Sequence, residues 1–162
     1  MSEQYQGLSR FAFALTGNEP EASDLTQQTF CIWGEKGHRL RDPTKAKAWL
    51  FTTLNREFLK GKRRQARFPE REFDERHGGT VDLSPSVVHD LDGRLIVEAL
   101  GELNVTYRTA LALFYLEDQS YREIAAILRV PIGTVKSRIA RGKEQLGSSM
   151  KEQHAALVLE NG

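Results

Sequence analysis

The sequence is poor in the residues that build disulfides, metal clusters and membrane spans. It contains one cysteine, Cys31, which excludes an internal disulfide and a cysteine-cluster metal site and favours a reducing compartment. No apolar run approaches the roughly 20 residues that cross a bilayer, and the polar start MSEQYQ carries no secretory apolar segment. These absences predict a cytoplasmic protein with no membrane insertion.

The sequence also lacks the residue clusters that carry catalysis. Its four histidines lie far apart, without metal-type spacing, at His38, His77, His89 and His154. No glycine-rich phosphate loop and no nucleophile–base pair is visible. We therefore expect no enzymatic activity, no bound metal and no cofactor.

What the sequence does contain is charge of both signs, segregated along the chain. The whole chain has a net charge of +1, yet residues 35–67 carry 11 basic and 3 acidic side chains, net +8. Residues 105–146 carry 7 and 4, net +3, whereas residues 68–104 between them carry 3 and 9, net −6. Two basic segments around an acidic one indicate two separate contacts with a polyanion, and a spacer that does not bind it.

Residues 120–146 predict two short helices joined by a tight turn. Ser120 and Glu123 form a capping box at the start of the first helix, and its apolar stripe consists of Ile124, Ile127 and Leu128. Pro131 suits the first turn of the second helix, because its missing N–H would have no partner there. This is the pattern of a helix-turn-helix.

The second of these helices is expected to pack with one face and bind DNA with the other. At about 100° per residue, the packing face collects Ile132, Val135, Ile139 and Leu146. The opposite face collects Ser137, Ala140, Arg141 and Glu144, flanked by Lys136 and Arg138. Gly133 and Thr134 let the helix start approach a phosphate, and the outer face suits a major groove. The alternative is an ordinary helical hairpin with a solvated charged face.

The composition of the middle of the chain separates two domains. Residues 68–90 show little helical periodicity and contain Pro69, Gly78, Gly79 and Pro85, which indicates a linker, or alternatively a long surface loop. We expect an all-α fold of two small helical domains, residues 1–67 and 92–147, joined by a flexible acidic linker over residues 68–91. Residues 148–162 are expected to form an adaptable tail.

The first domain is expected to contain three helices. The first covers about residues 4–15 and stops at Thr16-Gly17-Asn18, and the second starts near Pro20. The outer face of the second helix carries Asp24, Gln27, Gln28 and Cys31. The third starts at Asp42-Pro43 and ends near Arg64, and its apolar face carries Ala46, Leu50, Phe51, Leu54 and Phe58.

The other side of the third helix combines cations, hydroxyls and an indole. The residues in this broad sector are Lys45, Trp49, Thr52, Thr53, Arg56, Lys60 and Arg63. Cations neutralise phosphates, and an indole can stack on an unpaired base, a contact worth roughly 1–3 kcal/mol. The sector therefore suits melted or single-stranded DNA. The alternative is that Trp49 packs against a neighbouring helix while the cations are solvated.

The order of these modules resembles the sigma factors of bacterial RNA polymerase, in particular the short extracytoplasmic-function group of the sigma-70 family. FAFALTGNEPEASDLTQQTFCIW is similar to the helix pair of that family that ends in an Asp-Leu-x-Gln-Glu-x-Phe pattern, with Gln28 in place of the glutamate. The resemblance implies that Asp24, Gln27 and Gln28 bind the clamp helices of the polymerase.

KAKAWLFTTLNREFLKGKRR resembles the family's helix for the minus-10 promoter element, where the duplex is opened. The residues implied to contact minus-10 DNA are Lys45, Trp49, Thr52, Arg56, Lys60 and Arg63. Arg56 and Lys60 stand where the family often has an asparagine and an acid. The loop over residues 34–41 corresponds to the loop that captures a base.

Residues 100–146 resemble the domain that recognises the minus-35 element. The resemblance implies that bases contact Lys136, Ser137, Ala140 and Arg141, and that phosphates contact Arg122, Thr134 and Arg138. It also implies that an apolar helix over residues 106–116 presents a surface to the polymerase flap, and that the acidic residues 70–75 occupy a basic channel. Asn104 stands where the family usually has proline.

We therefore expect a sigma factor that brings core RNA polymerase to the promoters of a stress or envelope response and helps to melt the start site. An anti-sigma protein is a further partner that the resemblance allows. The alternative is a helix-turn-helix regulator of response-regulator type, which would bind duplex DNA without polymerase. That alternative requires an amino-terminal sensing or dimerising domain, and no receiver pattern is visible.

Overall fold

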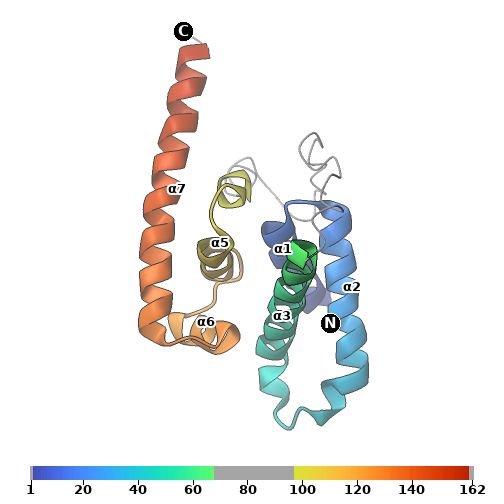
Figure 1. Cartoon of the computed structure of the whole chain (residues 1–162). Coiled ribbons are helices and arrows are strands. Elements are labelled where there is room, and N and C mark those ends of the chain that lie inside the picture. Colours follow the sequence, from blue (N-terminus) through green and yellow to red (C-terminus); the bar gives the residue numbers. More distant parts are fainter. Residues whose placement is uncertain (1, 68–96, 161–162) are drawn as a thin grey trace.

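Two groups of helices lie side by side in the protein (Figure 1). The computed structural model describes residues 2–67 and 97–160. The first range, here called the N-terminal lobe, contains α1 (Ser2–Thr16), α2 (Glu19–Lys36) and α3 (Ala46–Arg67). Two 3-10 turns, η1 (Gly37–Arg39) and η2 (Pro43–Lys45), connect α2 to α3.

The second range, here called the C-terminal lobe, begins with helical residues 97–101. It continues with α5 (Val105–Leu111), the π-helical turn η4 (Ala112–Leu116), α6 (Tyr121–Leu128) and α7 (Ile132–Glu160). The prediction of an all-α fold with two small helical domains is confirmed within the described residues. The predicted linker over residues 68–91, including the acidic residues 70–75, lies outside them.

Local side-chain chemistry explains where the helices of the N-terminal lobe start and stop. Gly17 ends α1 with a φ of +67°, a conformation that costs glycine little. The side chain of Asn18 then accepts a hydrogen bond of 3.1 Å from the backbone N–H of Glu21 and caps α2. Asp42 caps η2 in the same way, by accepting 3.0 Å from the N–H of Thr44.

The structure differs from the expected tail at the C-terminus. α7 continues from Ile132 through Glu160, well beyond the predicted domain end at residue 147. A glycine inside a helix costs only about 1 kcal/mol, so Gly147 does not stop it. The residues that follow are mostly good helix formers, among them methionine, lysine, glutamate, glutamine, alanine and leucine.

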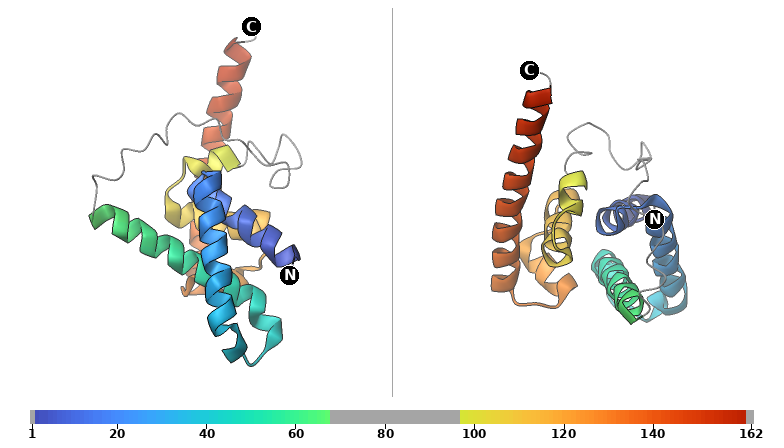
Figure 2. Two further views of the ribbon diagram at one scale, coloured as in Figure 1. Left: turned by 90° about the vertical axis from the view of Figure 1, so that its right-hand side faces the viewer. Right: turned by 45° about the horizontal axis from the view of Figure 1, so that its top comes forward.

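The two lobes share one hydrophobic core. Helix α1 contacts α5 and η4, and α3 contacts α6, an arrangement visible from two sides in Figure 2. The buried apolar side chains form a single cluster that includes Phe11 and Phe51 of the N-terminal lobe and Leu111 and Ile124 of the C-terminal lobe. The described part of the chain is therefore packed as one unit, in which the lobes cover each other's apolar surfaces.

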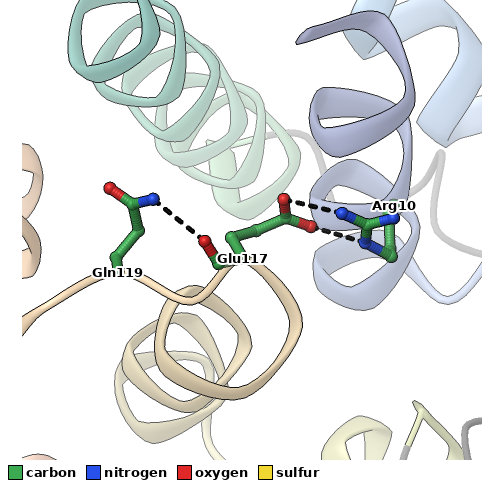
Figure 3. Close-up of polar contacts among 3 residues, drawn as sticks. All are labelled: Arg10, Glu117 and Gln119. Carbon is green, nitrogen blue, oxygen red and sulfur yellow. Dashed lines mark hydrogen bonds and ion pairs between the residues drawn. The ribbon is translucent and has the colours of Figure 1, made fainter. Parts of the chain in front are cut away.

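An ion pair crosses the boundary between the lobes (Figure 3). The guanidinium of Arg10 on α1 donates two hydrogen bonds to the carboxylate of Glu117, of 2.8 and 3.0 Å. The Glu117 side chain is only 2% exposed, and its burial raises the pKa of the carboxyl, although Arg10 acts in the opposite direction. The charge of Glu117 therefore depends on the opposite lobe for its compensation.

A second arginine, Arg108, also donates a hydrogen bond across the boundary between the lobes. Arg108 on α5 donates 2.7 Å to the carbonyl of Leu15 in the last turn of α1, and 2.9 Å to the carbonyl of Leu103. Burial lowers the pKa of this guanidinium, and charged donors make strong bonds to carbonyls that a helix end leaves unpaired. Arg108 thus joins the end of α1 to the start of α5.

Candidate nucleic-acid interface

Helices α6 and α7 form the predicted helix-turn-helix. The hydroxyl of Ser120 accepts 3.1 Å from the N–H of Glu123, whose carboxylate accepts 2.8 Å from the N–H of Ser120. The predicted capping box is therefore confirmed. Arg129 ends α6 in the left-handed conformation, with a φ of +56°, which costs a non-glycine residue about 1 kcal/mol. This sharp turn reverses the chain before α7 begins.

The inner and outer faces of α7 agree with the prediction except at its first residue. Val135 and Ile139 are buried at 0 and 1% exposure, and Leu146 is half-buried. Ile132, predicted to pack, is 43% exposed, because a residue at the very start of a helix projects beyond the neighbours that cover the next turn. Four predicted base contacts are all exposed: Lys136, Ser137, Ala140 and Arg141.

The structure brings most of the predicted minus-35 residues together around one depression. This depression, of about 340 Å³, is lined by Thr134, Ser137, Arg138 and Arg141 of α7. Arg122 is exposed on α6 and does not line it. Thr106 and Tyr107 of α5 also line the depression. Sequence reasoning missed their place here, because it assigned residues 106–116 to another surface.

The position of α7 depends on a close approach to α5. A Cβ atom at Gly142 would lie 2.7 Å from a methyl carbon of Leu111 and 3.4 Å from Cβ of Tyr107. Any larger residue at position 142 would require the Leu111 side chain or α7 itself to shift. The orientation of the exposed face of α7 is therefore set by its contact with the core.

The cations predicted on α3 are exposed, but the sector is narrower than expected. Lys45, Arg56, Lys60 and Arg63 are all exposed, and Thr52 is half-buried with its hydroxyl donating 2.7 Å to the carbonyl of Ala48. Thr53, predicted in this sector, is instead buried at 2% exposure. It lies at the edge of the sector, where the helix surface turns toward the core.

The indole ring of Trp49 is partly buried between α3 and α2. Its ring packs edge-on against Trp33 of α2, with 5.2 Å between the ring centroids, and the residue is half-buried. Trp33 in turn lies over Gly37 of η1, where a Cβ atom would come within 2.7 Å of the ring. The packing alternative for Trp49 is therefore present, and its stacking on a base stays a prediction.

Most of the predicted minus-10 residues face the C-terminal lobe. Thr52, Arg56, Lys60 and Arg63 line a groove of about 420 Å³. The opposite wall of this groove is made by Ile127, Leu128 and Arg129 of α6 and its turn. In this arrangement four arginine and lysine side chains, three from α3 and Arg129 from α6, surround one groove. Lys45 and Trp49 lie outside it.

The outer face of α2 carries a further set of predicted contact residues. Asp24, Gln27 and Gln28 are all exposed, as the helical pattern predicts. The amide of Gln28 donates 2.9 Å to the carboxylate of Glu57 on α3. Sequence reasoning did not include Glu57, since it lies 29 residues away on another helix.

The apolar helix over residues 106–116 is not an open surface in this arrangement. Ala110, Leu111, Ala112 and Leu113 are fully buried, and this segment packs against α1. Tyr115 alone among its large apolar side chains is strongly exposed, at 44%. While the lobes are packed together, α1 and α7 cover this segment, and its contact with the polymerase flap stays a prediction.

Comparison with known proteins gives matches over both lobes. The family profile "Sigma-70 region 2" matches residues 2–68, and "Sigma-70, region 4" matches residues 93–146. The extracytoplasmic-function sigma factor SigL of Mycobacterium tuberculosis is 33% identical over 148 residues, which are 90% of this chain and 83% of SigL.

SigE of Mycolicibacterium smegmatis, also an extracytoplasmic-function sigma factor, is 36% identical over 141 residues. These are 85% of this chain and 54% of SigE, so the chain spans about half the length of that relative. Among solved structures, the sigma factor RpoE of Bartonella quintana in complex with the anti-sigma factor NepR aligns with a TM-score of 0.78 and 29% identity. The alignment covers 93% of both chains.

Proposed function

The chain belongs to the extracytoplasmic-function group of sigma-70 factors, which direct RNA polymerase to promoters without catalysing a reaction, and from this premise we propose how its surfaces divide that work. The C-terminal lobe recognises the minus-35 element, and the N-terminal lobe binds the minus-10 element and the polymerase. The observation that carries this division is that α3 and α7 each bury one apolar face and hold exposed cations on the other.

In the C-terminal lobe, α7 is the recognition helix. Lys136, Ser137, Ala140 and Arg141 face base edges in the major groove. Thr134 and Arg138 bind a backbone phosphate at the depression that Ser137 and Arg141 also line. Arg122 binds a second phosphate from α6. Phosphate contacts fix the register of such a helix, while the base contacts give sequence preference.

In the N-terminal lobe, α3 holds the minus-10 DNA while it is melted. Arg56, Lys60 and Arg63 neutralise the phosphates of the separated strand, together with Lys45 at the helix start. Trp49, partly exposed beside Trp33, offers its ring face for stacking on an unpaired base. The adjacent loop over residues 34–41 sets the preference for the base that is captured.

The lobes have to separate before both promoter elements are bound. The groove that holds Arg56, Lys60 and Arg63 is walled by α6, so DNA on α3 and the packed position of α6 exclude each other. We propose that binding to core polymerase replaces the contacts between the lobes. The linker then turns two weak DNA contacts into one bivalent contact with a higher effective concentration.

The outer face of α2 is the proposed polymerase contact, with Asp24, Gln27 and Gln28 against the clamp helices. Its test is the change of Asp24 and Gln27 together to Ala. We expect weaker binding to core polymerase in a pull-down and an unchanged thermal midpoint, because both side chains are exposed. Unaltered binding would remove this face from the proposal.

Reconstitution tests the function as a whole. Core polymerase with the purified chain should give run-off transcripts from a promoter library, and the chain alone should not shift a short duplex. A shift without polymerase would favour the alternative, a helix-turn-helix regulator. Such a regulator needs an amino-terminal sensing domain, whereas residues 2–68 of this chain match a sigma region.

The cellular setting follows from the partner. Because polymerase acts in the cytoplasm, we place the chain there. Within the described ranges no helix is long and apolar enough to cross a membrane. The structure of Bartonella quintana RpoE with NepR supports an anti-sigma protein as a second partner of this chain.

A further inference from the structure

A groove between α2 and α3 lies beside the proposed polymerase contact. It has a volume of about 240 Å³. Asp24, Leu25 and Gln28 of α2 form one wall, while Glu57, Phe58 and Gly61 are among the residues of α3 that form the other. The two helices contact each other and cross at an angle (Figure 2), and the groove lies between their facing surfaces.

One carboxylate in this groove, that of Glu57, has little exposure to solvent. Its side chain is only 8% exposed, whereas Asp24 at the rim is exposed. One carboxylate oxygen of Glu57 accepts the 2.9 Å hydrogen bond from the amide of Gln28. The other oxygen lies 4.0 Å from Nε of Arg56, which leaves that oxygen able to accept a further hydrogen bond.

We propose that Glu57 is a polymerase-binding residue that supplies, from α3, the negative charge that the family pattern carries at position 28 of α2. The proposal rests on the assignment of Asp24, Gln27 and Gln28 to the polymerase contact. The hydrogen bond between Gln28 and Glu57 holds the carboxylate beside the same point of the surface. The charge missing at position 28 is thus replaced by one from another helix.

The groove fits an arginine side chain of the polymerase. Leu25 and Phe58 offer apolar surface to the methylene stem, and Glu57 accepts hydrogen bonds from the guanidinium at the end. Among the described residues, the carboxylates of Glu57 and Asp24 line this groove together with the ammonium group of Lys62. This excess of negative charge favours a cationic partner.

The test measures binding of the full-length chain to core polymerase in the absence of DNA. Glu57→Gln removes the charge but keeps an amide that can bond to Gln28, and we expect the dissociation constant to rise about tenfold. Gln28→Glu in the Glu57→Gln background returns a carboxylate to the same place and should recover most of the affinity. Glu3→Gln, an exposed change on α1, is the matched control and should bind like the unchanged chain.

A second variant fills the groove without changing any charge. A Cβ atom at Gly61 meets no neighbour within 4 Å, and leucine favours the helix more than glycine does. Gly61→Leu should therefore fold normally and still weaken polymerase binding, because its side chain occupies the space of the incoming arginine. Circular dichroism and the thermal midpoint of each variant check the fold.

The outcomes separate this inference from the proposed function. If the unchanged chain fails to bind core polymerase, the proposed function is overturned. If it binds, and Glu57→Gln and Gly61→Leu bind equally well, the inference about Glu57 is overturned while the proposed function stands. Loss of binding by Glu57→Gln without recovery by Gln28→Glu also contradicts the inference, since position 28 would then not be equivalent.

Discussion

The two helices proposed to contact DNA are presented in opposite ways. The outer face of α7 is open to solvent at Lys136, Ser137 and Arg141. The corresponding face of α3 lies against the other lobe, with Lys60 and Arg63 in a groove whose far wall is α6. One DNA surface is therefore accessible while the lobes are packed together, and the other is shared with a neighbouring helix.

This difference shows that the two contacts are not equivalent steps of promoter binding. The α7 surface needs no rearrangement before it meets a duplex. The α3 surface requires that the contacts of α1 and α3 with the C-terminal lobe be broken first, among them the pair of Arg10 and Glu117. Changes at the boundary should thus affect α3 and spare α7.

The largest effect is expected from Arg10→Ala. It leaves the buried carboxylate of Glu117 without its guanidinium, and losing one partner of a buried pair costs about 3–5 kcal/mol. The chain can escape this cost by separating its lobes. We expect a lower thermal midpoint and a larger radius of gyration in small-angle scattering. Once the lobes separate, the DNA-binding face of α3 should be as accessible as that of α7.

Two variants sharpen the meaning of that result. Arg64→Ala removes an exposed cation of α3 and should leave the radius unchanged. Glu117→Gln should cost less than Arg10→Ala, because burial already raises the pKa of Glu117 and so favours its uncharged form. An equal or larger loss for Glu117→Gln would contradict this account of the boundary.

The second-largest effect is expected from a change on the exposed face of α7. Arg141→Ala should cost about 1–3 kcal/mol of promoter binding and relax preference at one position of the minus-35 element, if the guanidinium is bidentate to a guanine. Competition binding of the holoenzyme to single-base promoter variants measures both quantities. A uniform loss across all variants would instead make Arg141 a phosphate contact.

Trp49→Leu tests a side chain of α3 that lies outside the groove walled by α6 and that has two possible tasks, packing and base stacking. Leucine keeps apolar contact with Trp33 but cannot stack on a base, which is worth roughly 1–3 kcal/mol. We expect slower opening of the promoter, read by a fluorescent base at the minus-10 element, and nearly normal closed-complex formation. If closed binding falls equally, Trp49 serves only the packing against Trp33.

The smallest effect is expected from Lys60→Gln. An exposed lysine that binds one phosphate should weaken binding similarly for all promoter sequences and lower the salt dependence by about one counterion. A titration of holoenzyme binding against salt concentration gives this slope. No change in slope would mean that Lys60 is solvated in the complex.

The sequence predicted the features that depend on near neighbours in the chain. The capping box of Ser120 and Glu123, the stop at Gly17 and the helix start at Asp42 follow from short-range chemistry. The exposed face of α7 follows from helical periodicity. Errors at Ile132 and Thr53 arise at the edges of faces, where periodicity gives a direction but not the neighbour that covers it.

Features that depend on the packing of distant segments could not be predicted. Arg10 and Glu117 are separated by 107 residues, and nothing in either neighbourhood selects the other. The burial of residues 110–113 against α1 and α7 could not be predicted for the same reason. Glu57 was passed over because its relation to Gln28 exists only once α2 and α3 are packed.

The bare backbone at Gly142 has a consequence for how promoter preference could change. Since α7 rests directly on the side chains of Leu111 and Tyr107 there, a bulkier residue has to displace either the Leu111 side chain or α7 itself. Where α7 moves, every base-facing group moves with it. Variation at this interior position is therefore a route to changing the angle of the bound helix, which differs from replacing single groups on its outer face.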